Sequence, residues 1–224
     1  MRKSWRKIFA SGAAAVTAVL VTAVGAPSAL ATGTTWTVSP GGDYSGVTYS
    51  IKVTDTATGT QFACTHDGKI GIEGNFTSGN GEANPIGVIA EIHNRVHPGF
   101  TCTGPGGNVW HLDSSGEGWF FYAFKYDAST GVTTGKLYGF AINLYISPTD
   151  GCYISLDGTA QYSNNGKVRF QYHNADAQLD LLPGGAALKA VYLYNCSGVP
   201  VNQGDPMSVQ AKFTLTPAQA ISSP

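Results

Sequence analysis

Short runs in which apolar and polar residues alternate recur along this chain, and Gly, Pro, Asn or Asp residues bound most of them. The clearest run covers residues 208–216, where every second side chain is apolar. A period of two, rich in β-branched and aromatic residues, is typical of a half-buried β-strand. Further runs predict strands over 47–54, 141–146, 167–173 and 188–194. Many short strands with turns between them predict an all-β, antiparallel β-sandwich or barrel, two folds that alternation alone does not distinguish.

Two segments need a choice between structures. Pro85 is placed to begin a helix, but residues 86–92 also alternate as a strand. We predict a strand, because the segments around it are β. The dipeptide Asn165-Gly166 is the strongest candidate for a tight hairpin turn.

The chain carries few charges, since only 12% of its 224 residues are charged. Glu, Lys and Arg are too scarce for a coiled coil or a long helical bundle. We expect no nucleic-acid partner, because nothing in the composition supplies a basic surface.

The N-terminus has the pattern of a secretory signal peptide. Four basic residues between Arg2 and Lys7 precede an uncharged run from Ile8 to Val24, and Ala29-Leu30-Ala31 follows. Small residues at this spacing predict cleavage after Ala31, so residues 1–31 would be removed. Residues 32–224 are then a single extracellular domain, secreted or held at the cell surface, without a transmembrane segment. This domain keeps nine of the 13 Lys and Arg residues against 14 Asp and Glu, a net charge of −5.

All four cysteines fall within the predicted exported domain. An even number in an exported chain predicts two disulfides. Of the three pairings, we favour Cys64–Cys102 and Cys152–Cys196, which have similar separations and give each half of the domain one bond. We expect no metal or redox site on these thiols, because no Cys-x-x-Cys motif is present.

Aromatic residues concentrate between positions 110 and 126. The interpretation that this composition favours is a central strand over 119–126 that is buried on both faces. The alternative is an exposed row of rings that stacks sugars, with polar neighbours that bind their hydroxyl groups. The candidate ligand-binding residues for that site are Trp110, His111, Asp113, Trp119 and Tyr122.

Other catalytic and cofactor patterns are weak. A carboxylate-based glycoside hydrolase would draw its pair of acids from Glu73, Glu91 and Asp113. His93 and His97 lack the glutamate of a zinc-protease motif, and a strand would hold them ~13 Å apart. We therefore expect no metal, no cofactor and no assigned catalytic residue.

Several turn and strand signatures are similar to those of a group of small secreted actinobacterial proteins with no assigned activity. The matching segments are 36–42, 102–106, 126–135, 204–206 and 213–221, spread over nearly the whole predicted domain. This resemblance implies a bacterial source, export, disulfides and an all-β fold, and it carries over no catalytic residue.

Together these observations predict an exported, non-catalytic protein of the cell surface or extracellular medium. The first alternative is a carbohydrate-binding module that uses the aromatics at 110–126, with polysaccharide or cell-wall material as its partner. The second is the glycoside hydrolase.

Overall fold

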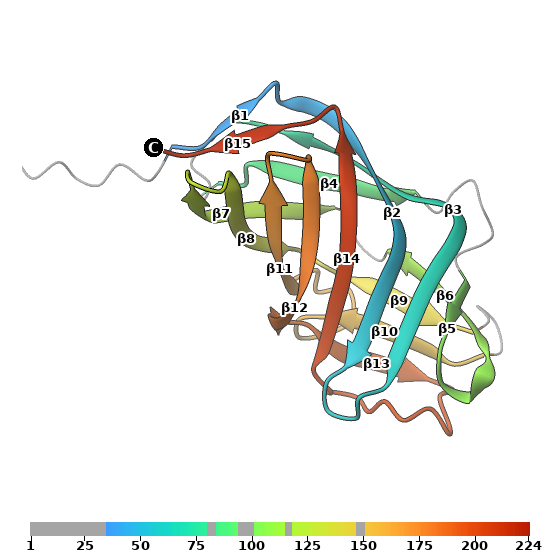
Figure 1. Ribbon diagram of the computed structural model, residues 1–224. Coiled ribbons are helices and arrows are strands. Elements are labelled where there is room, and N and C mark those ends of the chain that lie inside the picture. The colour runs from blue at the N-terminus through green and yellow to red at the C-terminus, as the bar shows by residue number, and fades with distance from the viewer. Residues whose placement is uncertain (1–34, 80–83, 94–100, 115–117, 147–150) are drawn as a thin grey trace, which may run out of the picture. The chain divides into compact units, whose positions relative to one another are not determined.

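Eight antiparallel strands close into a ring in the computed structural model, which describes residues 35–79, 84–93, 101–114, 118–146 and 151–224 (Figure 1). The predicted all-β antiparallel fold is confirmed. In ring order the strands are β3 (Gln61–Phe76), β2 (Gly42–Asp55), β14 (Met207–Thr216), β12 (Gln178–Ala187), β11 (Lys167–His173), β8 (Val132–Tyr138), β7 (Trp119–Asp127) and β4 (Gly87–His93). The ring is a barrel because β4 also pairs with β3.

A second antiparallel sheet branches from β3. Residues 71–76 of β3 pair with β4, whereas residues 63–65 pair with β5, so the long strand serves both sheets. In sheet order the added strands are β5 (Thr101–Thr103), β6 (Val109–Ser114), β9 (Ile142–Tyr145), β10 (Tyr153–Asp157) and β13 (Lys189–Tyr194). The short 3₁₀ turn η1 (Pro105–Gly107) connects β5 to β6.

Both predicted disulfides are present. Cys64 and Cys102 lie directly opposite each other on β3 and β5, with their Cα atoms 3.7 Å apart. Cys152 precedes β10 and Cys196 follows β13, with their Cα atoms 4.4 Å apart. One bond therefore fastens the second sheet to the barrel, and the other fastens that sheet's outermost strand to its neighbour.

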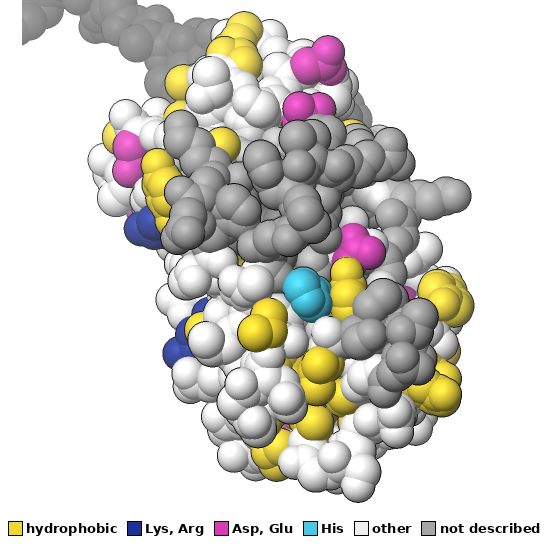
Figure 2. All heavy atoms as spheres, turned by 90° about the vertical axis from the view of Figure 1, so that its right-hand side faces the viewer, with side chains coloured by type: hydrophobic (Ala, Val, Ile, Leu, Met, Phe, Trp, Pro, Cys, Tyr) yellow, Lys and Arg dark blue, Asp and Glu magenta, His cyan; other side chains and the backbone are white. Residues whose placement is uncertain are grey.

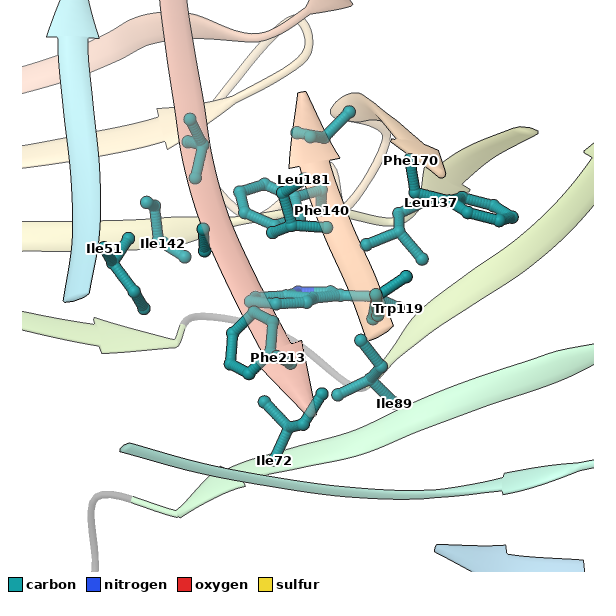
Figure 3. Close-up of a cluster of buried hydrophobic side chains, with 14 of the residues drawn as sticks. Ile51, Ile72, Ile89, Trp119, Leu137, Phe140, Ile142, Phe170, Leu181 and Phe213 are labelled. Carbon is teal, nitrogen blue, oxygen red and sulfur yellow. The ribbon is translucent and has the colours of Figure 1, made fainter. Parts of the chain in front are cut away.

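The core lies inside the barrel and continues under the second sheet. Alternation sends one side chain in two inward, as the burial pattern of β14 shows. Trp119 and Phe213 of the barrel line a cavity of about 10 Å³ together with Leu112 and Ile142 of the second sheet. Figure 3 shows Ile142 among the barrel side chains of this core. So little empty space means that the apolar face of the second sheet is closely packed against the barrel interior.

A two-stranded ribbon of β1 (Thr37–Ser39) and β15 (Ala220–Ser222) lies at the end of the barrel where β14 ends (Figure 1). Hydrogen bonds join it to β11: the Tyr172 hydroxyl donates to the Gln219 carbonyl over 2.8 Å. The Ile221 amide donates to the Asn174 side chain over 2.9 Å. These bonds satisfy polar groups at the margin of an apolar core.

The predicted strands match the observed ones to within one residue, except that β2 begins at Gly42, five residues before the predicted start, and the ambiguous segment 86–92 is strand β4. The predicted hairpin at Asn165-Gly166 is wrong. Residues 158–166 instead form a long connection from β10 in the second sheet to β11 in the barrel, two strands that do not pair. Glycine is needed at position 166 because a Cβ atom there would collide with the Phe140 carbonyl oxygen.

The described residues all belong to one compact unit. The predicted signal peptide, residues 1–31, lies outside them, as does His97. Among the residues that the structure describes, no helix has the length and apolar character needed to cross a membrane.

Candidate functional site

The two tryptophans of the predicted site lie in the core. Trp110 on β6 is fully buried, and its ring packs edge-on against Phe62 with 4.8 Å between the centroids. Trp119 on β7 is 3% exposed and packs 4.1 Å from the Phe140 ring. A buried ring offers no face to a ligand, so neither tryptophan can contribute a ring to a surface site.

The other residues of β7 correct the favoured interpretation of a strand buried on both faces. Phe120 and Phe124 are 39% and 41% exposed on the outer wall of the barrel. Tyr122 is half-buried on the same side, with its ring 4.6 Å from that of Tyr138 on β8. β7 therefore buries one row of side chains and exposes the other.

His111 and Asp113 lie elsewhere, on the outer face of the second sheet. Their neighbours Trp110 and Leu112 on β6 are buried, so alternation turns His111 and Asp113 away from the core. The predicted set is thus divided among the core, the barrel wall and the second sheet. The structure brings His111 and Asp113 together, and it separates them from Tyr122.

The strand register of the second sheet places three tyrosines beside His111. His111 is opposite Tyr145 on β9, Tyr145 is opposite Tyr153 on β10, and Tyr153 is opposite Tyr194 on β13. We call these four residues the tyrosine platform. The His111 and Tyr145 rings stack with centroids 5.4 Å apart, and Tyr194 is 56% exposed. With strands ~4.8 Å apart, the platform extends about 14 Å across the sheet.

A second row lies two residues further along each strand. It consists of Asp113, Asn143, Ser155 and Tyr192, which are opposite one another in that order. We call it the polar row. The Asn143 side-chain oxygen is buried and has no hydrogen-bond partner among the described residues. Ser155 is also buried, so the side chains of the polar row that reach solvent are those of Asp113 and Tyr192.

Figure 2 shows a face on which a histidine side chain lies among hydrophobic ones, tyrosine included, with carboxylates nearby. The Lys and Arg side chains in this view lie at its left edge. Hydrophobic, histidine and carboxylate side chains are thus interspersed on the described part of this face.

Electrostatic coupling joins the two rows. Burial raises the pKa of Tyr145, and the neighbouring Asp113 carboxylate raises it further. Burial also raises the pKa of Tyr153, with added repulsion from Tyr162 and Asp113. Asp113 therefore lies close enough to act on two platform hydroxyls, and both hydroxyls remain protonated donors at neutral pH.

The connection 158–166 is held beside the platform by one buried carboxylate. Asp157, at the end of β10, is fully buried and accepts four backbone N–H bonds from this connection. The donors are the amides of Gly158, Asn164, Asn165 and Gly166, at 2.6, 2.9, 3.0 and 3.1 Å. Gln161 of the same connection hydrogen-bonds to the Tyr153 side chain. Asp157 is thus the turn-forming residue of this region, and it positions the 158–166 connection beside the platform.

The proposed hydrolase acids lie on both sheets. Glu73 on β3 is opposite Glu91 on β4 in the barrel wall, and Glu73 is exposed. Asp113 is on β6, in the second sheet. The structure therefore pairs two of the three candidates and leaves the third apart.

Sequence reasoning missed Tyr145, Tyr153, Tyr192 and Tyr194. Each of their strands alternates a tyrosine with buried aliphatic residues, and this signal is visible in the sequence. What alternation cannot reveal is that β6, β9, β10 and β13 are neighbours in space, because three connections separate them along the chain.

Comparison with known protein families, with curated proteins and with solved structures found no match to this chain.

Proposed function

We propose that the chain is an exported, non-catalytic carbohydrate-binding protein, and that the tyrosine platform binds a neutral sugar chain. The observation that carries this proposal is the alignment of His111, Tyr145, Tyr153 and Tyr194 on four adjacent strands, with the polar row beside them.

The chemistry of the two rows suits a sugar. The C–H face of a pyranose packs against an aromatic ring, and its hydroxyl groups need donors and acceptors at the ring's margin. The platform supplies the rings, while the half-buried carboxylate of Asp113 supplies an acceptor. A length of about 14 Å accommodates several consecutive sugar units rather than one.

The charge of the site favours a neutral ligand. Asp113 already raises the pKa of Tyr145, so its negative charge acts on the surface where the sugar would lie. A uronic acid placed there would be repelled by the same carboxylate.

A binding role is favoured over hydrolysis. Hydrolysis of a glycoside needs two carboxyl groups that flank the scissile bond. The platform and the polar row together contain one carboxylate, Asp113, and Glu73 and Glu91 belong to the barrel wall. The single acid is suited to accept hydrogen bonds from hydroxyl groups.

Export is part of the proposal. It is supported by the signal-peptide pattern of residues 1–31 and by two disulfides, which persist in oxidising compartments. N-terminal sequencing of the protein recovered from the medium should begin at Thr32. Protein that retains residues 1–31 in the cell would contradict export.

The binding proposal is tested with a panel of neutral polysaccharides and the variants Tyr153→Ala and Tyr194→Ala. Loss of one stacking ring costs roughly 1–2 kcal/mol, which weakens affinity about 5–30-fold. The matched control is Tyr49→Ala, because Tyr49 is 64% exposed on the barrel strand β2 and lies outside both rows.

We expect saturable binding that both platform variants weaken and the control does not. An equal loss in all three variants, or no binding across the panel by the folded wild-type protein, would refute the proposal. Near-ultraviolet circular dichroism of each variant confirms that the core is intact.

A further inference from the structure

We propose that the barrel wall carries a second binding surface, which takes an acidic, carboxylate-bearing polysaccharide. A hollow of about 500 Å³ lies where β7, β8 and β11 meet the end of the 158–166 connection. Its side chains combine rings, amides and a cation: Phe120, Tyr138, Asn164, Asn165 and Lys167. We call this surface the basic groove.

Strand register builds the floor of the groove. Phe120 on β7 is opposite Tyr138 on β8, which is opposite Lys167 on β11. The Lys167 ammonium lies over the Tyr138 ring, 4.5 Å from its centroid. A ring and a cation in contact form a surface that can stack a sugar and pair with its carboxylate at the same time.

A parallel row lies two residues further along each strand, outside the lining of the hollow, and we count it as part of the basic groove. Tyr122 is opposite Lys136, which is opposite Arg169. The Tyr122 ring contacts that of Tyr138, so the aromatic surface is continuous between the two rows. Arg169 is exposed, and Lys136 and Lys167 are half-buried, with neighbours on the strands that point into the core.

The charge of these two rows opposes that of the whole domain. Their six residues include three cations and no carboxylate, although the predicted exported domain has a net charge of −5. The neighbouring acid on β12, Asp180, is engaged by the Lys212 ammonium at 3.6 Å and the His173 ring nitrogen at 3.7 Å. The groove therefore concentrates positive charge where the domain is otherwise acidic.

The arrangement fits a polymer better than a single anion. The backbone positions that carry the cations are ~4.8 Å apart on neighbouring strands, and those in successive rows are ~6.7 Å apart along a strand. The three cations are thus distributed over two strands and two rows beside the rings. A chain of uronic acids presents a carboxylate on each sugar, so successive sugars can stack while their carboxylates meet different cations.

The side of the groove is held in place by the buried carboxylate of Asp157. Asn164 has a left-handed backbone, with φ of 47°, and its amide donates to Asp157 over 2.9 Å. The Asn165 side chain donates to Thr159 over 2.8 Å. The asparagines therefore present a fixed edge to a ligand, which reduces the ordering cost of binding.

The test compares polygalacturonate with its neutral methyl ester, using the whole exported protein. The double variant Lys167→Gln with Arg169→Gln removes two cations and keeps the rings, and Phe120→Ala removes a ring and keeps the cations. The matched control is Lys52→Gln, since Lys52 is exposed on β2 outside the two rows.

We expect the wild-type protein to bind the acidic polymer at least tenfold more tightly than its ester, with an affinity that falls as salt rises. The double variant should lose that preference, Phe120→Ala should weaken binding about tenfold, and the control should match the wild type. Equal affinity for acid and ester, or equal loss in the control, would overturn the proposal. Tighter binding of single-stranded DNA than of polygalacturonate would also overturn it, because stacked rings and cations would then serve nucleic acid.

This inference does not rest on the tyrosine platform. Tyr153→Ala should bind polygalacturonate as the wild type does, and the lysine–arginine double variant should keep its binding of neutral polysaccharide. Each proposal therefore fails separately.

Discussion

Replacing Asp157 with alanine should lower the free energy of unfolding by about 2–6 kcal/mol. The carboxylate accepts four backbone N–H bonds, and those from Gly158 and Gly166 are buried. Truncation to a methyl group leaves these two donors without an acceptor, and each buried unpaired donor costs ~1–3 kcal/mol. The other two bonds, from Asn164 and Asn165, are partly buried, so water can replace part of what they lose.

Urea denaturation measures this effect as a shift of the midpoint at constant slope. Asp127→Ala is the control, because Asp127 also accepts bonds from the Ser129 amide and hydroxyl, at 3.0 and 2.6 Å, but at an exposed turn. Asp157→Asn should fall between the wild type and the alanine variant, since its amide keeps one acceptor oxygen. A midpoint for Asp157→Ala no lower than that of the Asp127 control would refute the role of Asp157 as the anchor of the 158–166 connection.

Two further results are expected. The double variant Cys152→Ser with Cys196→Ser opens a 44-residue loop and should lower the free energy of unfolding by about 4 kcal/mol. This variant should also weaken neutral-sugar binding more than the double variant of Cys64 and Cys102 does, because only the Cys152–Cys196 bond secures β13 of the platform. Equal sugar binding by the two double variants would show that the Cys152–Cys196 bond does not hold the platform in its binding geometry. Asp113→Asn should lower the pKa of Tyr145, measured by NMR of its ring, yet leave it above the usual value because burial is the larger cause. A pKa that does not change would mean that the Asp113 carboxylate does not act on Tyr145.

The alkaline limit of stability follows from the buried tyrosines. Burial raises the pKa of Tyr44 and Tyr172 above the usual value of about 10. The folded state therefore holds these protons more tightly than the unfolded state. The contribution to stability is complete below about pH 10 and declines as the pH rises above it. Tyr44→Phe should flatten this decline in denaturation measured between pH 9 and 12, and an unchanged decline would show that Tyr44 does not cause it.

The sequence predicts the strands well because alternation is local. Apolar and polar residues alternate within segments 208–216 and 167–173, and the burial of side chains along β14 and β11 follows this alternation closely. The disulfide pairing can also be predicted from the sequence, because the spacing of the four cysteines favours one of the three possible pairings, and this is the pairing observed.

The sites were harder to predict because they depend on which strands are neighbours. Trp110 and His111 are adjacent in the sequence, yet one lies in the core and the other on the platform. The tyrosines beside His111 come from three later strands, and only register aligns them. The hairpin prediction at Asn165-Gly166 is wrong because it also depended on which strands are neighbours. The strands β10 and β11 belong to different sheets, and the dipeptide ends a long connection between them.

Binding of a neutral sugar chain by the tyrosine platform can be observed by NMR of the protein with labelled tyrosine rings. A neutral oligosaccharide, chosen from the polysaccharide that the protein binds, is added until binding saturates. The ring signals of Tyr145, Tyr153 and Tyr194 should shift together with one dissociation constant, while that of Tyr49 on β2 should stay in place. Saturable binding that leaves the three platform signals unchanged would show that the sugar binds elsewhere and that the platform is not its site.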